Sequence, residues 1–70
     1  MRSRSNAYFR MGAAVAVSEM FGSGRLGDGR RAAEDARRFL ASFGVRGMAD
    51  VDALGIKGPY AADLARIYEI

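Results

Sequence analysis

The chain has 70 residues, a net charge of +3, and neither cysteine nor histidine. This composition excludes disulfide bonds, thiolate chemistry, the usual structural zinc sites and a histidine proton shuttle, and it indicates a reducing, cytoplasmic setting. A chain this short has a core worth only about 3–5 kcal/mol, so we expect one small helical domain over residues 1–70.

Charge is distributed unevenly along the chain. Residues 1–46 hold nine arginines against four carboxylates, a net charge of +5, whereas residues 47–70 carry a net charge of −2. Arginine binds carboxylates and phosphates through a planar, two-pronged set of donors. The sequence therefore predicts an acidic partner, most simply a protein surface, with nucleic acid as the alternative.

The first predicted element is a helix over about residues 6–21, preceded by a flexible basic arm at residues 1–5. One apolar face follows the three- and four-residue spacing of a helix, and a second lies beside it. The first face carries Phe9, Ala13, Ala16, Val17 and Met20, and the second carries Tyr8, Met11, Ala14 and Val15. So much apolar surface must be buried, either because this helix is central in a small bundle or because its second face meets another chain. The protein is then a monomer or a homodimer through this helix, and Gly12 and Ala16 would let a neighbouring helix come close.

A glycine-rich loop follows over residues 22–29, GSGRLGDG. Its letters match the glycine-rich dinucleotide fingerprint, but a helix precedes it where that site needs a strand, so we expect a connector and no cofactor. Asp28 suits the cap of a second helix over about residues 29–43, which Gly44 ends. The charged face of this helix contains arginines spaced to pair with acids four residues away: Arg30 with Glu34, Arg31 with Asp35, and Glu34 with Arg38.

A short helical turn is predicted at about residues 48–54, and a last helix runs from Pro59 to about Glu69. Asp50 and Asp52 are better explained as charges in a helical turn than as metal ligands. The predicted fold is all-α, a small bundle of three helices plus a short helical turn. Its predicted core is Phe9, Val17, Met20, Phe39, Leu40, Phe43, Leu64 and Ile67.

The segment LGIKGPYAADLARI, Leu54 to Ile67, resembles two nucleic-acid-binding motifs. Taken from Val51 to Ile67, the apolar positions and the turn at Gly55 are similar to a helix-turn-helix. The stretch from Gly55 onward also resembles a helix-hairpin-helix, although its glycines are three residues apart instead of two. The helix-turn-helix resemblance implies a small DNA-binding regulator, and the helix-hairpin-helix resemblance implies a segment like those of some DNA repair proteins. The contacting residues would be Lys57, Tyr60 and Arg66.

The leading functional hypothesis is a non-enzymatic module that binds an acidic protein surface. The last helix is net acidic, which is unfavourable for reading DNA, and no serine lies near a suitable base in the sequence. The predicted partner-binding residues are Arg10, Arg25, Arg30, Arg31, Arg37 and Arg38. Exposed ion pairs contribute little, so Arg37→Glu and Arg38→Glu are expected to leave the melting temperature nearly unchanged. The size of the chain is also typical of phage or mobile-element inhibitors of host complexes, anti-CRISPR proteins among them.

Overall fold

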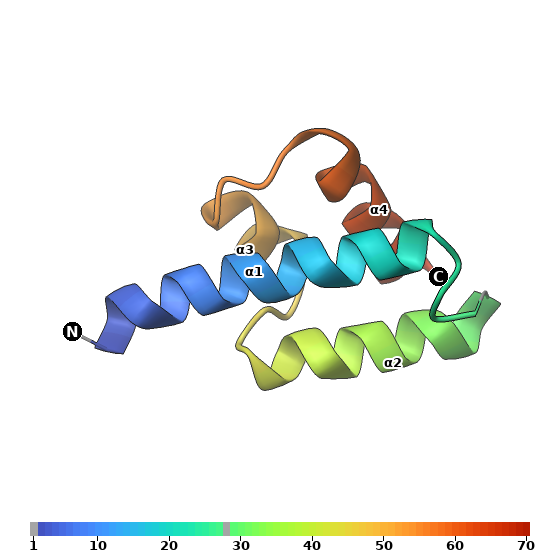
Figure 1. Ribbon diagram of the computed structural model, residues 1–70, viewed down its shortest axis with the longest axis horizontal. Coiled ribbons are helices and arrows are strands. Elements are labelled where there is room, and N and C mark those ends of the chain that lie inside the picture. Colours follow the sequence, from blue (N-terminus) through green and yellow to red (C-terminus); the bar gives the residue numbers. More distant parts are fainter. Residues whose placement is uncertain (1, 28) are drawn as a thin grey trace.

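The computed structural model describes residues 2–27 and 29–70, with side chains from residue 7 onward (Figure 1). Over these residues the protein is all-α and contains no strand, as predicted. The helices are α1 (Arg2–Gly22), α2 (Gly29–Ser42), α3 (Met48–Ala53) and α4 (Gly58–Glu69). The bounds of α2, α3 and α4 agree with the predicted elements to within one residue.

The start of α1 differs from the prediction. The helix begins at Arg2, whereas the apolar period predicted a start at about residue 6. Residues 2–5 are polar, so they do not contribute to the apolar period from which the helix was predicted. They include neither glycine nor proline and so do not oppose a helix. The predicted flexible arm at residues 1–5 overlaps this turn, and its flexibility stays a prediction. Met1 and the predicted cap residue Asp28 lie outside the described residues.

Helix α1 lies in the middle of the bundle. It contacts both α2 and α4, which also touch each other, while α3 packs on α4. Figure 1 shows α1 and α2 running antiparallel, with α3 and α4 on the opposite side of α1 and with the amino end of α1 projecting past its neighbours. The interpretation of this helix as the centre of a small bundle is therefore confirmed. No helix in the described part of the chain combines the length and hydropathy needed to span a membrane.

The core combines small and larger side chains, and all of its buried alanines come from α1 and α2. The buried alanines of these two helices are Ala13, Ala14, Ala32, Ala33 and Ala36. Alanine at facing positions shortens the distance between helix axes. The larger buried side chains are Val17, Phe21, Leu40, Val45, Val51, Ile56, Leu64 and Ile67.

Half of the predicted core is wrong. Val17, Leu40, Leu64 and Ile67 are buried as expected, and Met20 is only half-buried. Phe9, Phe39 and Phe43 keep 63%, 46% and 37% of their surface exposed. On α2 the buried positions are filled by Ala32, Ala33, Ala36 and Leu40. These residues, and not the phenyl rings, form the packed stripe of the helix.

Helices α2 and α3 end in the same way. Gly44 and Gly55 follow them with φ of 89° and 78°, in the left-handed region that favours glycine. After α2, the Val45 N–H donates to Leu40 O at 2.9 Å; after α3, the Ile56 N–H donates to Val51 O at 3.4 Å. This is the Schellman pattern, in which the residue after the glycine also folds back as an apolar contact. The donor and acceptor residues of both bonds are buried and apolar, so each turn is fixed to the core. They are Leu40, Val45, Val51 and Ile56.

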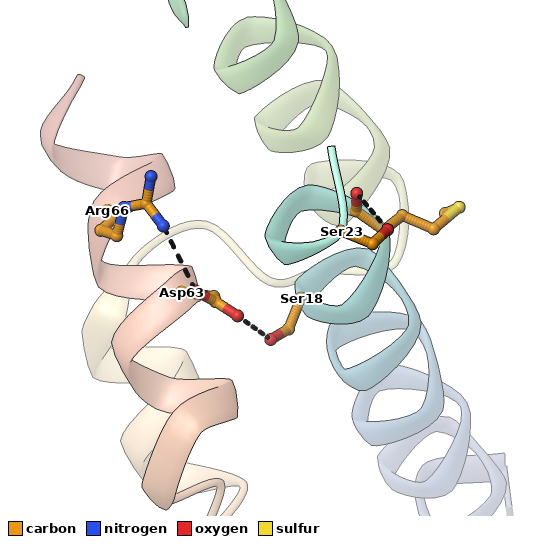
Figure 2. Close-up of polar contacts among 5 residues, drawn as sticks. Ser18, Ser23, Asp63 and Arg66 are labelled. Carbon is orange, nitrogen blue, oxygen red and sulfur yellow. Dashed lines mark hydrogen bonds and ion pairs between the residues drawn. The ribbon is translucent and has the colours of Figure 1, made fainter. Parts of the chain in front are cut away.

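A polar junction joins α1 to α4 (Figure 2). The buried Ser18 hydroxyl donates to Asp63 Oδ2 at 3.4 Å, and Asp63 Oδ1 lies 3.5 Å from Arg66 Nη1. A Cβ on Gly22 would lie 2.7 Å from Asp63 Oδ2, so the absence of a side chain there allows the carboxylate to approach α1.

Within the described part of the chain no helix approaches closely at Gly12 and Ala16, whereas the predicted approach of a helix from another chain stays a prediction. Both residues are exposed, and a Cβ at Gly12 would meet no atom within 4 Å. The close approach instead occurs at Gly22. Glycine spacing alone does not reveal which side of a helix faces its neighbour.

The carboxyl end of α4 is held by Tyr68, whose hydroxyl donates to Val45 O at 3.3 Å. Burial raises the pKa of the Tyr68 phenol above its ordinary value of 10.0; the Asp50 carboxylate raises this pKa further, and Arg37 lowers it. The fold therefore favours the neutral phenol.

The turn glycine at position 55 and the helix glycine at position 12 should respond oppositely to alanine. A Cβ at either site meets no atom within 4 Å, so only the backbone conformation differs. Gly55→Ala should lower the free energy of unfolding by about 1–2 kcal/mol, because its φ is positive. Gly12→Ala should raise it by about 0.5–1 kcal/mol, because alanine is the better helix former. Urea denaturation followed by circular dichroism measures both, and equal signs would contradict this account of the α3–α4 turn.

Alkaline pH should destabilise the fold through Tyr68. The folded state raises the pKa of Tyr68, so the neutral phenol adds to the free energy of unfolding. This contribution is fully present below about pH 10 and is lost as pH rises through the folded-state pKa. Tyr68→Phe should therefore show a shallower fall in melting temperature between about pH 9.5 and 11.5 than the wild type. Tyr8→Phe is the matched control, because Tyr8 is 74% exposed and should keep the steeper fall. Identical pH profiles for Tyr68→Phe and the wild type would refute this assignment.

Candidate protein-binding surface

Three phenylalanines expose their rings near the amino half of α1 and the carboxyl end of α2. Phe39 and Phe43 are four residues apart, about one helical turn, and their ring centroids are 5.1 Å apart with the rings tilted by 52°. Phe43 and Phe9 line a shared groove. We call Phe9, Phe39 and Phe43 the aromatic surface. Solvent-exposed phenylalanines gathered in this way are typical of protein interfaces.

The groove between α1 and the end of α2 has a volume of about 330 Å³. It is lined by Phe9, Arg10, Ser42 and Phe43, and we call it the aromatic groove. Its phenyl walls come from both helices, so the packing of α1 on α2 creates it. The Ser42 hydroxyl donates to Phe39 O at 2.6 Å. The Ser42 Oγ is therefore left as an acceptor.

Among the described side chains, Arg10 is the only charged one that lines the aromatic groove. A Cβ on Gly44 would lie 3.4 Å from Arg10 Nε, so the guanidinium packs against the glycine that follows α2. The carbonyl end of α2 carries a partial negative charge that stabilises a cation there. Nevertheless, Arg10 Nε is buried and has no hydrogen-bond partner among the described residues.

The arginines of α2 do not form the predicted pairs. Within the described residues, the ion pair found on this helix joins Arg38 to Asp35, three residues apart, at 3.8 Å. Both side chains of this pair are largely exposed, and Arg30 and Arg31 are exposed as well. These three arginines therefore remain accessible to a partner, as the sequence predicted for the helix surface.

Arg37 is not accessible in the same way. Its Nη1 donates to Ile67 O at 2.6 Å, so the guanidinium caps a carbonyl at the end of α4. We expected Arg37→Glu to leave stability unchanged because we took this side chain to be exposed and without a partner. The hydrogen bond to Ile67 O argues against that expectation. The sequence held no local signal for this contact, because Arg37 and Ile67 are 30 residues apart.

Arg25 lies at the opposite end of α1 from the aromatic groove. It is exposed and lines a separate hollow with Glu19, Met20 and Ser23. The six predicted arginines therefore divide among the groove, the surface of α2, the end of α4 and the loop after α1. They do not form one binding face.

The residues of the alternative DNA-binding hypothesis lie around α4. Lys57 is exposed just before the helix. The Tyr60 hydroxyl donates to Glu19 Oε2 at 3.4 Å, and the Arg66 guanidinium lies 5.2 Å from the centroid of the Phe21 ring while it also pairs with Asp63. Two of the three side chains are thus engaged with α1 and with a neighbouring acid.

The other candidate polar groups also have structural partners. The Ser18 hydroxyl is fully buried beside Asp63, where no substrate reaches it in this arrangement (Figure 2). Asp50 Oδ2 accepts the Arg46 N–H at 2.8 Å and so stabilises the start of α3, in agreement with its interpretation as a structural charge. Each of these polar groups is explained by the fold.

Comparisons of the chain with protein-family models, with curated proteins and with solved structures give no match. The functional argument therefore depends on the surface itself. Sequence reasoning missed Phe9, Phe39 and Phe43 as surface residues because it assigned all three to the core. The signal that could have found them is the run of alanines at positions 32, 33 and 36, which is a complete packing stripe without the phenylalanines.

Arg37 and Arg38 should differ in their effect on stability. Arg37→Gln should lower the free energy of unfolding by about 1 kcal/mol or more, because it removes a charged donor from the end of α4. Arg38→Gln should change it by less than about 0.5 kcal/mol, because its ion pair is long and exposed. Chemical denaturation of the two single variants measures the difference. Equal stabilities would show that the Arg37 hydrogen bond contributes nothing measurable.

Proposed function

We propose that this protein is a non-enzymatic protein-binding module that uses the aromatic surface and the arginines beside it. The supporting observation is the exposure of Phe9, Phe39 and Phe43 next to Arg10. Burying the exposed part of one such ring against a partner contributes on the order of 1 kcal/mol or more. Aromatic and arginine side chains are the residues that carry most of the energy in protein interfaces.

The exposed apolar surface extends along α1 beyond the phenylalanines. Tyr8 and Met11 are 74% and 39% exposed, and Gly12 and Ala16 are exposed as well. This continuity supports a partner that lies along the amino half of α1 and reaches the end of α2. The proposed partner has an acidic surface, since Arg10 lines the groove with two of the phenylalanines and the exposed Arg38 directly precedes Phe39. A phage or mobile-element inhibitor of a host complex is one form that such a module would take.

Affinity capture tests this proposal. The tagged full-length protein is incubated with bacterial lysate, with and without nuclease, and the bound material is identified by mass spectrometry. We expect one protein complex to be retained after nuclease treatment. Loss of all bound material with nuclease would favour the DNA-binding alternative through Lys57, Tyr60 and Arg66, and no capture in either condition would count against both.

Single variants test whether the captured partner binds the aromatic surface. Phe9→Ala should reduce the retained partner by at least about tenfold, with an unchanged melting temperature, because Phe9 is exposed and interface hot spots cost about 2 kcal/mol. Tyr60→Ala is the matched control, since Tyr60 is a partly exposed aromatic residue on α4. Equal capture by the wild type and Phe9→Ala would move the binding site away from the aromatic surface.

A further inference from the structure

The aromatic groove combines apolar walls with one unbalanced positive charge. Phe9 and Phe43 form its walls, and Arg10 supplies the charge. No carboxylate of the described residues lines the groove. The carbonyl end of α2 offsets roughly half of one charge, so the groove remains positive.

The carboxylates that form hydrogen bonds or ion pairs in the structure have their partners outside the groove. Asp35 pairs with Arg38, and Asp63 with Arg66. Asp50 accepts the Arg46 N–H, and Glu19 accepts the Tyr60 hydroxyl. Among the described residues, Arg10 makes no ion pair or hydrogen bond, although its Nε is out of contact with water. The buried Nε is out of reach of a ligand, so a carboxylate from outside would pair with the terminal nitrogens of the guanidinium, where charge-assisted hydrogen bonds are strong.

We propose that the aromatic groove binds a peptide segment of another protein in which an apolar side chain stands next to an aspartate or glutamate. The apolar side chain lies between Phe9 and Phe43, and the carboxylate accepts hydrogen bonds from the terminal nitrogens of Arg10. The Ser42 Oγ, which already donates to Phe39 O, is free to accept a backbone N–H of the segment. This inference rests on the proposed protein-binding function and adds the chemistry of the partner.

A peptide selection tests the chemistry directly. A display library of random 12-residue peptides is selected on the full-length protein at moderate salt. Enrichment of an apolar residue beside aspartate or glutamate is expected. Selection of peptides without acidic residues, or of none at all, would overturn the inference.

Matched variants then locate the binding site of the selected peptides. Arg10→Gln should weaken them by at least tenfold in a fluorescence anisotropy titration, whereas Arg46→Gln, which removes an equal charge from an exposed position after α2, should change affinity less than threefold. Phe9→Asp serves as a second test in case Arg10→Gln does not fold, because position 9 is exposed and the new carboxylate would stand beside Arg10. It should also weaken binding by at least tenfold. Peptides that bind both variants as tightly as the wild type would show that the groove is not their site.

The outcomes separate this inference from the broader function. If selected peptides require Arg10 but lysate capture yields no protein, the groove chemistry stands and the proposed cellular function fails. If capture succeeds and is unaffected by Arg10→Gln and Phe9→Asp, the binding function stands and the groove inference fails. A single-stranded oligonucleotide that displaces the selected peptides with equal affinity would indicate that the groove recognises phosphate, and it would also overturn the proposal.

Discussion

The burial of small side chains on α1 and α2 is the constraint on which the rest of this structure depends. On α2 the buried positions are filled by Ala32, Ala33, Ala36 and Leu40, and the larger Phe39 and Phe43 stay partly exposed. Phe9 is likewise exposed on α1, where Ala13, Ala14 and Val17 are among the buried residues. The burial pattern that forms the bundle therefore also leaves an exposed aromatic surface.

Helix α4 is held against the α1–α2 pair by its buried Leu64 and Ile67 and by polar contacts around them. Arg37 caps a carbonyl near its end, Tyr68 reaches back to the segment after α2, and Asp63 meets Ser18 on α1. In a chain of 70 residues, a few such contacts are a large share of the net stability. Some residues that resemble a binding face in the sequence are thus needed to hold the helices together.

The sequence was sufficient to predict the helices and their carboxyl ends. The apolar period and the glycines at positions 44 and 55 act locally, so α2, α3 and α4 begin and end close to where they were expected. The positions of individual side chains depend on which helix faces meet, and that depends on residues distant in the chain. For this reason Phe9 was assigned to the core and Arg37 to the surface, and the structure reverses both assignments. The arginines at positions 30, 31 and 38 were placed correctly because the outer face of α2 follows from its own charge pattern.

The contact between Ser18 and Asp63 also has a consequence for the order of folding. These residues are 45 positions apart, whereas α1 and α2 are joined by a short loop and form an antiparallel pair between neighbours in the chain. Closing a short loop costs less entropy than closing a long one, so the α1–α2 hairpin should form before α4 docks. Interactions that form after the transition state slow escape from the native state without accelerating its formation. The junction at Asp63 should therefore slow the unfolding of the bundle and have little effect on its folding rate.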